Sequence, residues 1–105
     1  MSLVLWEHPE ATAEYVAATG WYETRGQGLG VGLIDQVEAA QKRILEWPDA
    51  WPAFPGWERV PLVRTAKVAV YPYRISYVVR GTQVAILAYA HTSREPGYWH
   101  HRYDD

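Results

Sequence analysis

The chain has 105 residues and no cysteine, which allows one domain and excludes a disulfide framework, a thiolate nucleophile and a Cys-ligated metal. Hydrophobic residues make up 49% and charged residues 21%, as in ordinary soluble proteins, and no window approaches the ~18 apolar residues of a membrane span. The first seven residues lack the basic segment and long apolar run of a signal peptide, so we expect a cytoplasmic protein with a single domain over residues 1–105.

The net charge of −2 conceals a strong asymmetry along the chain. Residues 1–58 hold nine acidic side chains against three basic ones, whereas residues 59–102 hold seven basic side chains against Glu95 alone. Such a division indicates an anionic partner for the basic half. The alternative is that an acidic layer and a basic layer pack beside each other and neutralise each other.

The first half of the chain predicts a strand followed by two helices. Residues 3–7 form a short apolar run, and Pro9 suits the first turn of a helix. Apolar residues then recur at helical spacing, and the glycines of residues 26–32 end that helix. A second helical stripe runs over residues 33–45 until Trp47-Pro48. The stripe expected to face the core on the first helix is Ala13, Val16, Ala17, Gly20 and Trp21, and that on the second is Leu33, Ile34, Val37, Gln41, Ile44 and Leu45.

The second half predicts a sheet. Residues 48–57 hold three prolines and three large aromatic residues, which is typical of a loop whose aromatic rings cap the core. Strands are expected within residues 59–71, 73–79 and 84–89, with a hairpin turn at 80–83 and a short helical turn within 94–102. The predicted class is α+β, with an antiparallel helix hairpin on one face of a mostly antiparallel sheet in the order β-α-α-β-β-β.

Three familiar motifs are absent or incomplete. The alternating glycines of residues 26–32 follow a helix rather than a strand, so they predict a turn and not a phosphate loop. His91, His100 and His101 lack the spacing of a metal site, and we expect no metal and no cofactor. Ser76 and Ser93 do not lie in a nucleophile turn, which leaves an acyl-transfer triad without support.

One constellation of basic and aromatic residues remains. Arg64, Lys67 and Arg74 lie on adjacent predicted strands and share one surface if their alternation matches. The segment after the last strand adds a second group, which comprises His91, Ser93, Arg94, Tyr98 and Trp99. Arginine forks bind phosphate and aromatic rings stack on bases, so the set suits an RNA-binding or RNA-cleaving surface. The alternative is a set of solvated strand charges with aromatic residues packed on the C-terminal turn.

Two of these segments resemble the RelE/ParE superfamily of type II toxin–antitoxin toxins, which includes plasmid stabilisation proteins. They are Pro72-Tyr73-Arg74-Ile75-Ser76-Tyr77 and the ending His91-x-x-Arg94-x-Pro96-x-Tyr98-Trp99. The glycine-linked helix hairpin of residues 9–46 also fits, so the resemblance spans nearly the whole chain. It implies a small growth-inhibiting toxin neutralised by a cognate antitoxin protein. Its target is either DNA gyrase, inhibited without chemistry, or messenger RNA cleaved on the ribosome.

The RelE-like branch carries a basic pair on the strand before the Pro-Tyr-Arg segment. Lys67 matches one member of the pair, but Thr65 stands at the partner position and Arg64 points to the other face. Arg74 matches the arginine of the next strand. If the chain is RelE-like, the resemblance makes Lys67, Arg74, Arg94 and Tyr98 catalytic.

The C-terminal segment matches the family with a one-residue ambiguity. The family's arginine after the last strand corresponds to Ser93 or Arg94, and its terminal tyrosine falls near Tyr98 or Trp99. The target- or antitoxin-binding candidates are Arg64, Lys67, Arg74, His91, Arg94 and Trp99.

The missing basic partner favours a ParE-like, noncatalytic gyrase inhibitor. RNA cleavage through the ribose 2′-hydroxyl needs proton transfer, whereas arginine stays protonated and serves charge stabilisation. His91 has a suitable ordinary pKa, although it can equally hold the end of the last strand. The alternatives are a RelE-like ribosome-dependent endoribonuclease and a non-toxic relative that only binds its antitoxin.

Overall fold

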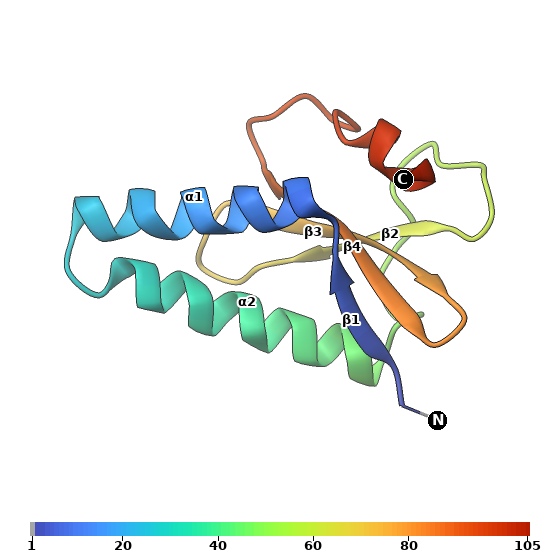
Figure 1. The fold of residues 1–105 in the computed structure, drawn as a ribbon, viewed down its shortest axis with the longest axis horizontal. Coiled ribbons are helices and arrows are strands. Elements are labelled where there is room, and N and C mark those ends of the chain that lie inside the picture. The colour runs from blue at the N-terminus through green and yellow to red at the C-terminus, as the bar shows by residue number, and fades with distance from the viewer. Residues whose placement is uncertain (1) are drawn as a thin grey trace.

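A computed structural model describes residues 2–105, and its elements follow the predicted order. Strand β1 (Val4–Glu7) leads into helices α1 (Pro9–Arg25) and α2 (Leu29–Glu46). Strands β2 (Val63–Lys67), β3 (Tyr73–Arg80) and β4 (Gln83–His91) follow, and a short 3-10 helix, η1 (His100–Asp104), comes near the C-terminus. Figure 1 shows the two helices side by side along one face of the sheet, with the C-terminal segment on the other side.

The four strands form one mixed sheet in the order β1-β4-β3-β2. The β2–β3 and β3–β4 pairs are antiparallel, whereas β1 adds to the three expected strands as a parallel neighbour of β4. Strand β4 is buried continuously from Val84 to Tyr89 because it lies between β1 and β3. The sheet contains one register shift, between Ser76 and Tyr77. Within residues 2–105, no helix combines the length and the apolar character that crossing a membrane would require.

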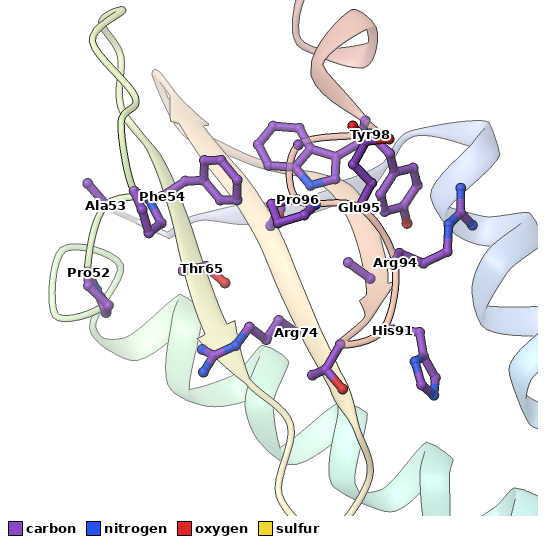
Figure 2. A pocket seen from close by; sticks show the side chains of 16 residues that line it. Pro52, Ala53, Phe54, Thr65, Arg74, His91, Arg94, Glu95, Pro96 and Tyr98 are labelled. Carbon is purple, nitrogen blue, oxygen red and sulfur yellow. The ribbon is translucent and has the colours of Figure 1, made fainter.

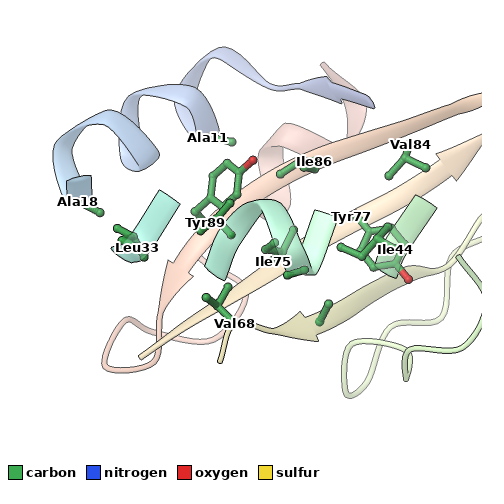
Figure 3. Close-up of a cluster of buried hydrophobic side chains, with 13 residues drawn as sticks. Ala11, Ala18, Leu33, Ile44, Val68, Ile75, Tyr77, Val84, Ile86 and Tyr89 are labelled. Atoms are coloured by element: carbon green, nitrogen blue, oxygen red, sulfur yellow. The ribbon is translucent and has the colours of Figure 1, made fainter. Parts of the chain in front are cut away.

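The main core lies between the helices and the sheet (Figure 3). Helix α2 contributes the expected stripe, of which Leu33, Val37 and Ile44 are fully enclosed. The stripe predicted for α1 is wrong, because it faces solvent: Val16 is 66% exposed and Trp21 is 52% exposed. The side of α1 that packs inward carries Ala11, Tyr15, Ala18 and Tyr22. Small alanines let the helices approach closely. The tyrosine rings supply apolar contact area, although tyrosine also carries a polar hydroxyl.

The opposite face of the sheet is covered by the segment before β2 and by the C-terminal segment. Phe54, Trp57, Trp99 and Tyr103 pack there against sheet residues such as Val78. The expectation that the aromatic residues of 48–57 cap the core is therefore confirmed. The first predicted strand is shorter than expected and begins only at Val63, after Pro61, whose ring nitrogen has no hydrogen to donate.

Candidate functional site

A cavity of about 410 Å³ opens on the sheet face opposite the helices (Figure 2). We call it the sheet-face cavity. Its floor is formed by side chains of β2, β3 and β4, and its walls come from residues 52–55 and 91–99. The floor and wall residues used below are Thr65, Ser76, Ala90, Phe54, Pro96 and Trp99, with Arg74, Arg94 and Glu95 as the charged members. Most of the lining is apolar, so the few polar groups stand out.

Strand pairing fixes which polar residues share the cavity floor. Thr65 lies directly opposite Ser76, and Lys67 lies directly opposite Arg74. Directly opposed residues of an antiparallel pair project to the same face, so all four side chains belong to this face. Two like charges in direct opposition destabilise a sheet. An anion bound between Lys67 and Arg74 would relieve that repulsion.

The basic residues of the second half fall into two groups. Four of them are held by the protein itself. Arg59 forms an ion pair with Asp104 at 2.7 Å, Arg80 donates to the Tyr103 carbonyl, and Arg64 and Arg102 have partners described below. The remaining three, Lys67, Arg74 and Arg94, have no hydrogen bond or ion pair from their side chains to any other residue within 2–105. The charge asymmetry is thus partly internal neutralisation and partly a set of free cations.

Arg94 and Tyr98 form a unit anchored by helix α1. The Arg94 guanidinium lies 3.9 Å from the centre of the Tyr98 ring, a cation–π contact. The Tyr98 hydroxyl donates to Glu14 Oε2 at 2.6 Å. Burial raises the pKa of Tyr98, and the hydrogen bond to Glu14 raises it further. Figure 2 shows Arg94 on the α1 side of the cavity and Arg74 on the β2 side, so the two guanidinium groups do not converge.

His91 ends β4, as predicted, and lies at the rim of the cavity. Its Nδ1 accepts a hydrogen bond from the Ser93 backbone N–H at 3.0 Å and lies 2.7 Å from the Ser93 hydroxyl. Trp99 is 1% exposed and packs back over the face of the sheet, beside Val63, Val78 and Leu87. Its ring forms cavity wall and core at once.

Arg64 is not brought together with Lys67 and Arg74. It pairs with Tyr77, whose side chain lies in the core between sheet and helices, so it projects to the helix side. Arg64 donates to the Trp51 carbonyl at 2.7 Å and lies 3.9 Å from an Asp49 carboxylate oxygen. The interpretation that Arg64 points to the other face is therefore confirmed, and the three basic residues do not share one surface, because positions 64 and 67 differ by an odd number of residues.

A second hollow of about 400 Å³ lies beside helix α1, and we call it the α1 groove. Ala17, Trp21 and Tyr22 of the helix line one side, and Tyr73 and Tyr89 of the sheet line the other. His91, Arg94 and Tyr98 border both hollows. The exposed apolar stripe of α1 thus continues into a groove with basic residues at its end.

One group of side chains has metal-ligand chemistry, and its geometry argues against a metal. Potential ligand atoms of His8, Glu10 and Asp105 lie within 4.8 Å of one another. The Glu10 backbone N–H donates to His8 Nδ1 at 3.1 Å, so Nδ1 presents a lone pair and the ring proton lies on Nε2. Nε2 is 2.7 Å from Asp105 Oδ2, to which it donates. A metal bound at Nε2 would move the ring proton to Nδ1, where it would point at the Glu10 backbone N–H. His8 therefore serves as a helix cap and, through Asp105, as a tether for the C-terminus.

Sequence reasoning missed three residues of this region. Glu14 is the first, because its partners Tyr89, Tyr98 and Arg102 lie more than 70 residues away in the chain. Thr65 and Ser76 are the others. From the sequence, Thr65 is only the residue that replaces a basic one, and Ser76 is only an unsupported nucleophile. The available signal was polar residues at the buried positions of two paired strands.

Comparisons with known proteins give a structural match only. No family model and no curated protein matches the sequence. Among solved structures, a chain of the chromosomal ParDE TA system from P. aeruginosa matches with a TM-score of 0.71 and 19% sequence identity. The match covers 88% of this chain and 98% of that chain. The chain therefore shares its fold with this component of a ParDE system, which confirms the RelE/ParE resemblance at the level of the fold.

Proposed function

We propose that this chain is the toxin component of a type II toxin–antitoxin pair and acts, in the cytoplasm, as a ParE-like inhibitor of DNA gyrase without cleaving RNA. The fold shared with a ParDE chain supports the toxin class. The observation that carries the noncatalytic assignment is the set of side chains around Arg74. That set holds cations, hydroxyls, His91 and the Glu95 carboxylate, but Figure 2 shows Glu95 beside Tyr98 and away from Arg74, and within the described residues no side-chain hydrogen bond joins His91 or Glu95 to Arg74.

Cleavage of RNA by its own 2′-hydroxyl needs a base to remove a proton and an acid to return one. Arg74 and Arg94 remain protonated in the neutral range and can only stabilise charge. The Tyr98 hydroxyl donates a hydrogen bond to Glu14, and its raised pKa keeps the hydroxyl neutral. His91 has one ring nitrogen engaged by Ser93, and Figure 2 shows its ring on the opposite side of the hollow from Arg74.

The partner we propose is an antitoxin that presents an apolar helix face to the α1 groove. Val16 and Trp21 leave an apolar stripe on α1 in water, which is the kind of surface that an amphipathic helix covers. Arg94 lies at the end of this groove without a carboxylate partner among residues 2–105. An acidic residue following the apolar helix face would therefore complete the contact.

The test is expression of the chain in cells with and without the antitoxin encoded beside it, with DNA supercoiling and messenger RNA integrity measured during growth arrest. We expect arrest that follows loss of gyrase activity and is relieved by the antitoxin. The variant Arg74→Ala tests the cavity, and Arg43→Ala on the exposed side of α2 is the matched control. Growth arrest with intact supercoiling and cut messenger RNA would refute the gyrase assignment.

The opposed Lys67–Arg74 pair favours one other candidate, a RelE-like endoribonuclease. Under that assignment Lys67, Arg74, Arg94 and Tyr98 act at the scissile phosphate, and Arg74→Ala lowers ribosome-dependent cleavage by about 10²–10³-fold. Absence of both arrest and cleavage, with antitoxin binding retained, identifies a relative that only binds its antitoxin.

A further inference from the structure

We propose that the sheet-face cavity binds a peptide segment in which a large aromatic side chain stands next to a carboxylate, with the carboxylate on Arg74 and the ring among the apolar walls. The inference deepens the proposed function, because it states the chemistry by which the partner would occupy this cavity.

The first argument comes from two unused hydroxyls on the cavity floor. Ser76 is 2% exposed and Thr65 is 8% exposed, and both line the cavity. Within residues 2–105, neither hydroxyl has a hydrogen-bond partner, and Figure 2 shows the Thr65 hydroxyl turned toward the hollow. The side-chain oxygens of both residues are not fully enclosed, so they face the open space of the cavity, where water or a ligand can bond to them. A ligand that places polar atoms beside Arg74 can therefore use both hydroxyls as donors or acceptors.

The second argument concerns the charge that the cavity accepts. Arg74 lines the cavity, and its guanidinium can hold a carboxylate through two parallel hydrogen bonds. Arg94 also lines the cavity, but its guanidinium is stacked on Tyr98 at the α1 side, and Lys67 does not line the cavity. Glu95 adds a negative charge to the same wall. One unstacked arginine, with a carboxylate in the same lining, suits a monoanion better than a phosphate with nearly two charges.

The third argument concerns the body of the ligand. Phe54, Pro96 and Trp99 supply apolar walls around the space above the hydroxyls. Aromatic and proline surfaces of this kind enclose a flat ring, and the volume of about 410 Å³ is in the range of ligand pockets. In a Trp-Asp or Phe-Glu dipeptide, the ring fills the apolar space while the neighbouring carboxylate binds Arg74.

The test measures the binding of three probes to the isolated chain. Calorimetry gives the affinity, and the amide NMR signals of Ala90 and Gly97 report binding at the cavity. The probes are the N-acetylated, C-amidated dipeptide Trp-Asp, its uncharged counterpart Trp-Asn, and adenosine monophosphate. We expect the Trp-Asp probe to bind with a dissociation constant on the order of 1 mM, and the Trp-Asn probe to bind at least tenfold more weakly. Shifts should be confined to residues around the cavity.

Three variants locate the probe. Arg74→Gln should weaken the Trp-Asp probe at least tenfold, and Ser76→Ala by roughly two- to tenfold, as expected for one lost hydrogen bond. Arg43→Gln removes an exposed charge from α2 and should leave the affinity unchanged. Arg74 is exposed and makes no side-chain hydrogen bond within 2–105, so its replacement leaves the fold intact.

Several results would overturn the proposal. Equal binding of the Trp-Asp and Trp-Asn probes removes the carboxylate from it, and equal binding to wild type and Arg74→Gln removes the cavity. Tighter binding of adenosine monophosphate, lost in Arg74→Gln, assigns the cavity to a nucleotide instead. Because no antitoxin, gyrase or ribosome is present in this assay, failure here is distinguishable from failure of the toxin assignment, which is decided by growth arrest.

Discussion

Replacing Glu14 by glutamine should destabilise the protein more than any other single loss of charge on α1. The Glu14 carboxylate accepts three hydrogen bonds, from the Tyr89 backbone N–H at 3.1 Å, the Tyr98 hydroxyl at 2.6 Å and Arg102 at 3.0 Å. One carboxylate thus joins α1 to β4, to the cavity wall and to η1. Burial alone would lower the pKa of Arg102, but the hydrogen bond and charge of Glu14, together with the charges of Tyr98 and Glu10, raise it.

The size of the effect follows from the burial of the pair. Removing one partner of a buried ion pair costs about 3–5 kcal/mol. The Arg102 side chain is 6% exposed, whereas that of Glu14 is 18% exposed, and Glu10 remains 3.7 Å from Arg102 Nε. A glutamine also turns an NH₂ group toward donors on one side. We therefore expect Glu14→Gln to lower the free energy of unfolding by about 2–4 kcal/mol.

Urea denaturation followed by tryptophan fluorescence measures this loss, with Glu38→Gln on the exposed side of α2 as the control. The control should change stability by less than about 0.5 kcal/mol. A double-mutant cycle of Glu14→Gln with Arg102→Met should give a coupling energy above about 1 kcal/mol. A loss below about 1 kcal/mol for Glu14→Gln, or additive effects in the cycle, would refute the assignment of Glu14 as the residue that fastens the C-terminal segment.

The other predictions concern packing and pH. Trp99→Ala should lower stability by about 3–5 kcal/mol, since the ring is 1% exposed; unchanged melting with lost activity would instead place Trp99 in the target site. Gly30→Ala should destabilise the protein, because the added Cβ would lie 2.8 Å from the Thr19 carbonyl oxygen. Gly20→Ala should stabilise it by about 0.5–1 kcal/mol, because nothing lies within 4 Å of the added Cβ. Thermal unfolding measures both, and the reverse order of stability would contradict the packing of α1 on α2. Burial raises the pKa of Tyr15 from 10.0 to about 12, so the unfolded chain ionises first and stability should fall between pH 10 and 12. Tyr15→Phe should reduce that slope, and an identical slope in the variant speaks against the shift.

The order and type of the elements could be predicted because local signals decide them. Helix α2 is marked by an apolar stripe and ended before Pro48, and β4 is an unbroken apolar run. Helix α1 shows where such signals fail. Its Val16–Trp21 stripe has the right period, but the side that packs on the core carries Ala11, Tyr15, Ala18 and Tyr22 instead. The period locates a helix without fixing which of two faces is buried.

The candidate site could be predicted in its residue types and less well in its geometry. Strand alternation separates Arg64 from Lys67, a difference that depends only on the two positions lying in one regular strand. The role of Glu14 was beyond sequence reasoning, because the three groups it accepts from are brought together only by the folded sheet. The same is true of Thr65 and Ser76, whose pairing depends on the β2–β3 register.

The basic half of the chain shows why charge counts alone cannot separate structure from function. Arg102 is buried and its charge is used to hold η1 on α1, so its replacement would report on stability whatever the protein binds. Arg74 is exposed and placed opposite Lys67, an arrangement that the sheet would be better without. A fold selected for stability alone would avoid that pair. The opposed Lys67–Arg74 pair, of which Arg74 lines the cavity and Lys67 does not, therefore supports the proposal that a negatively charged partner binds on this face.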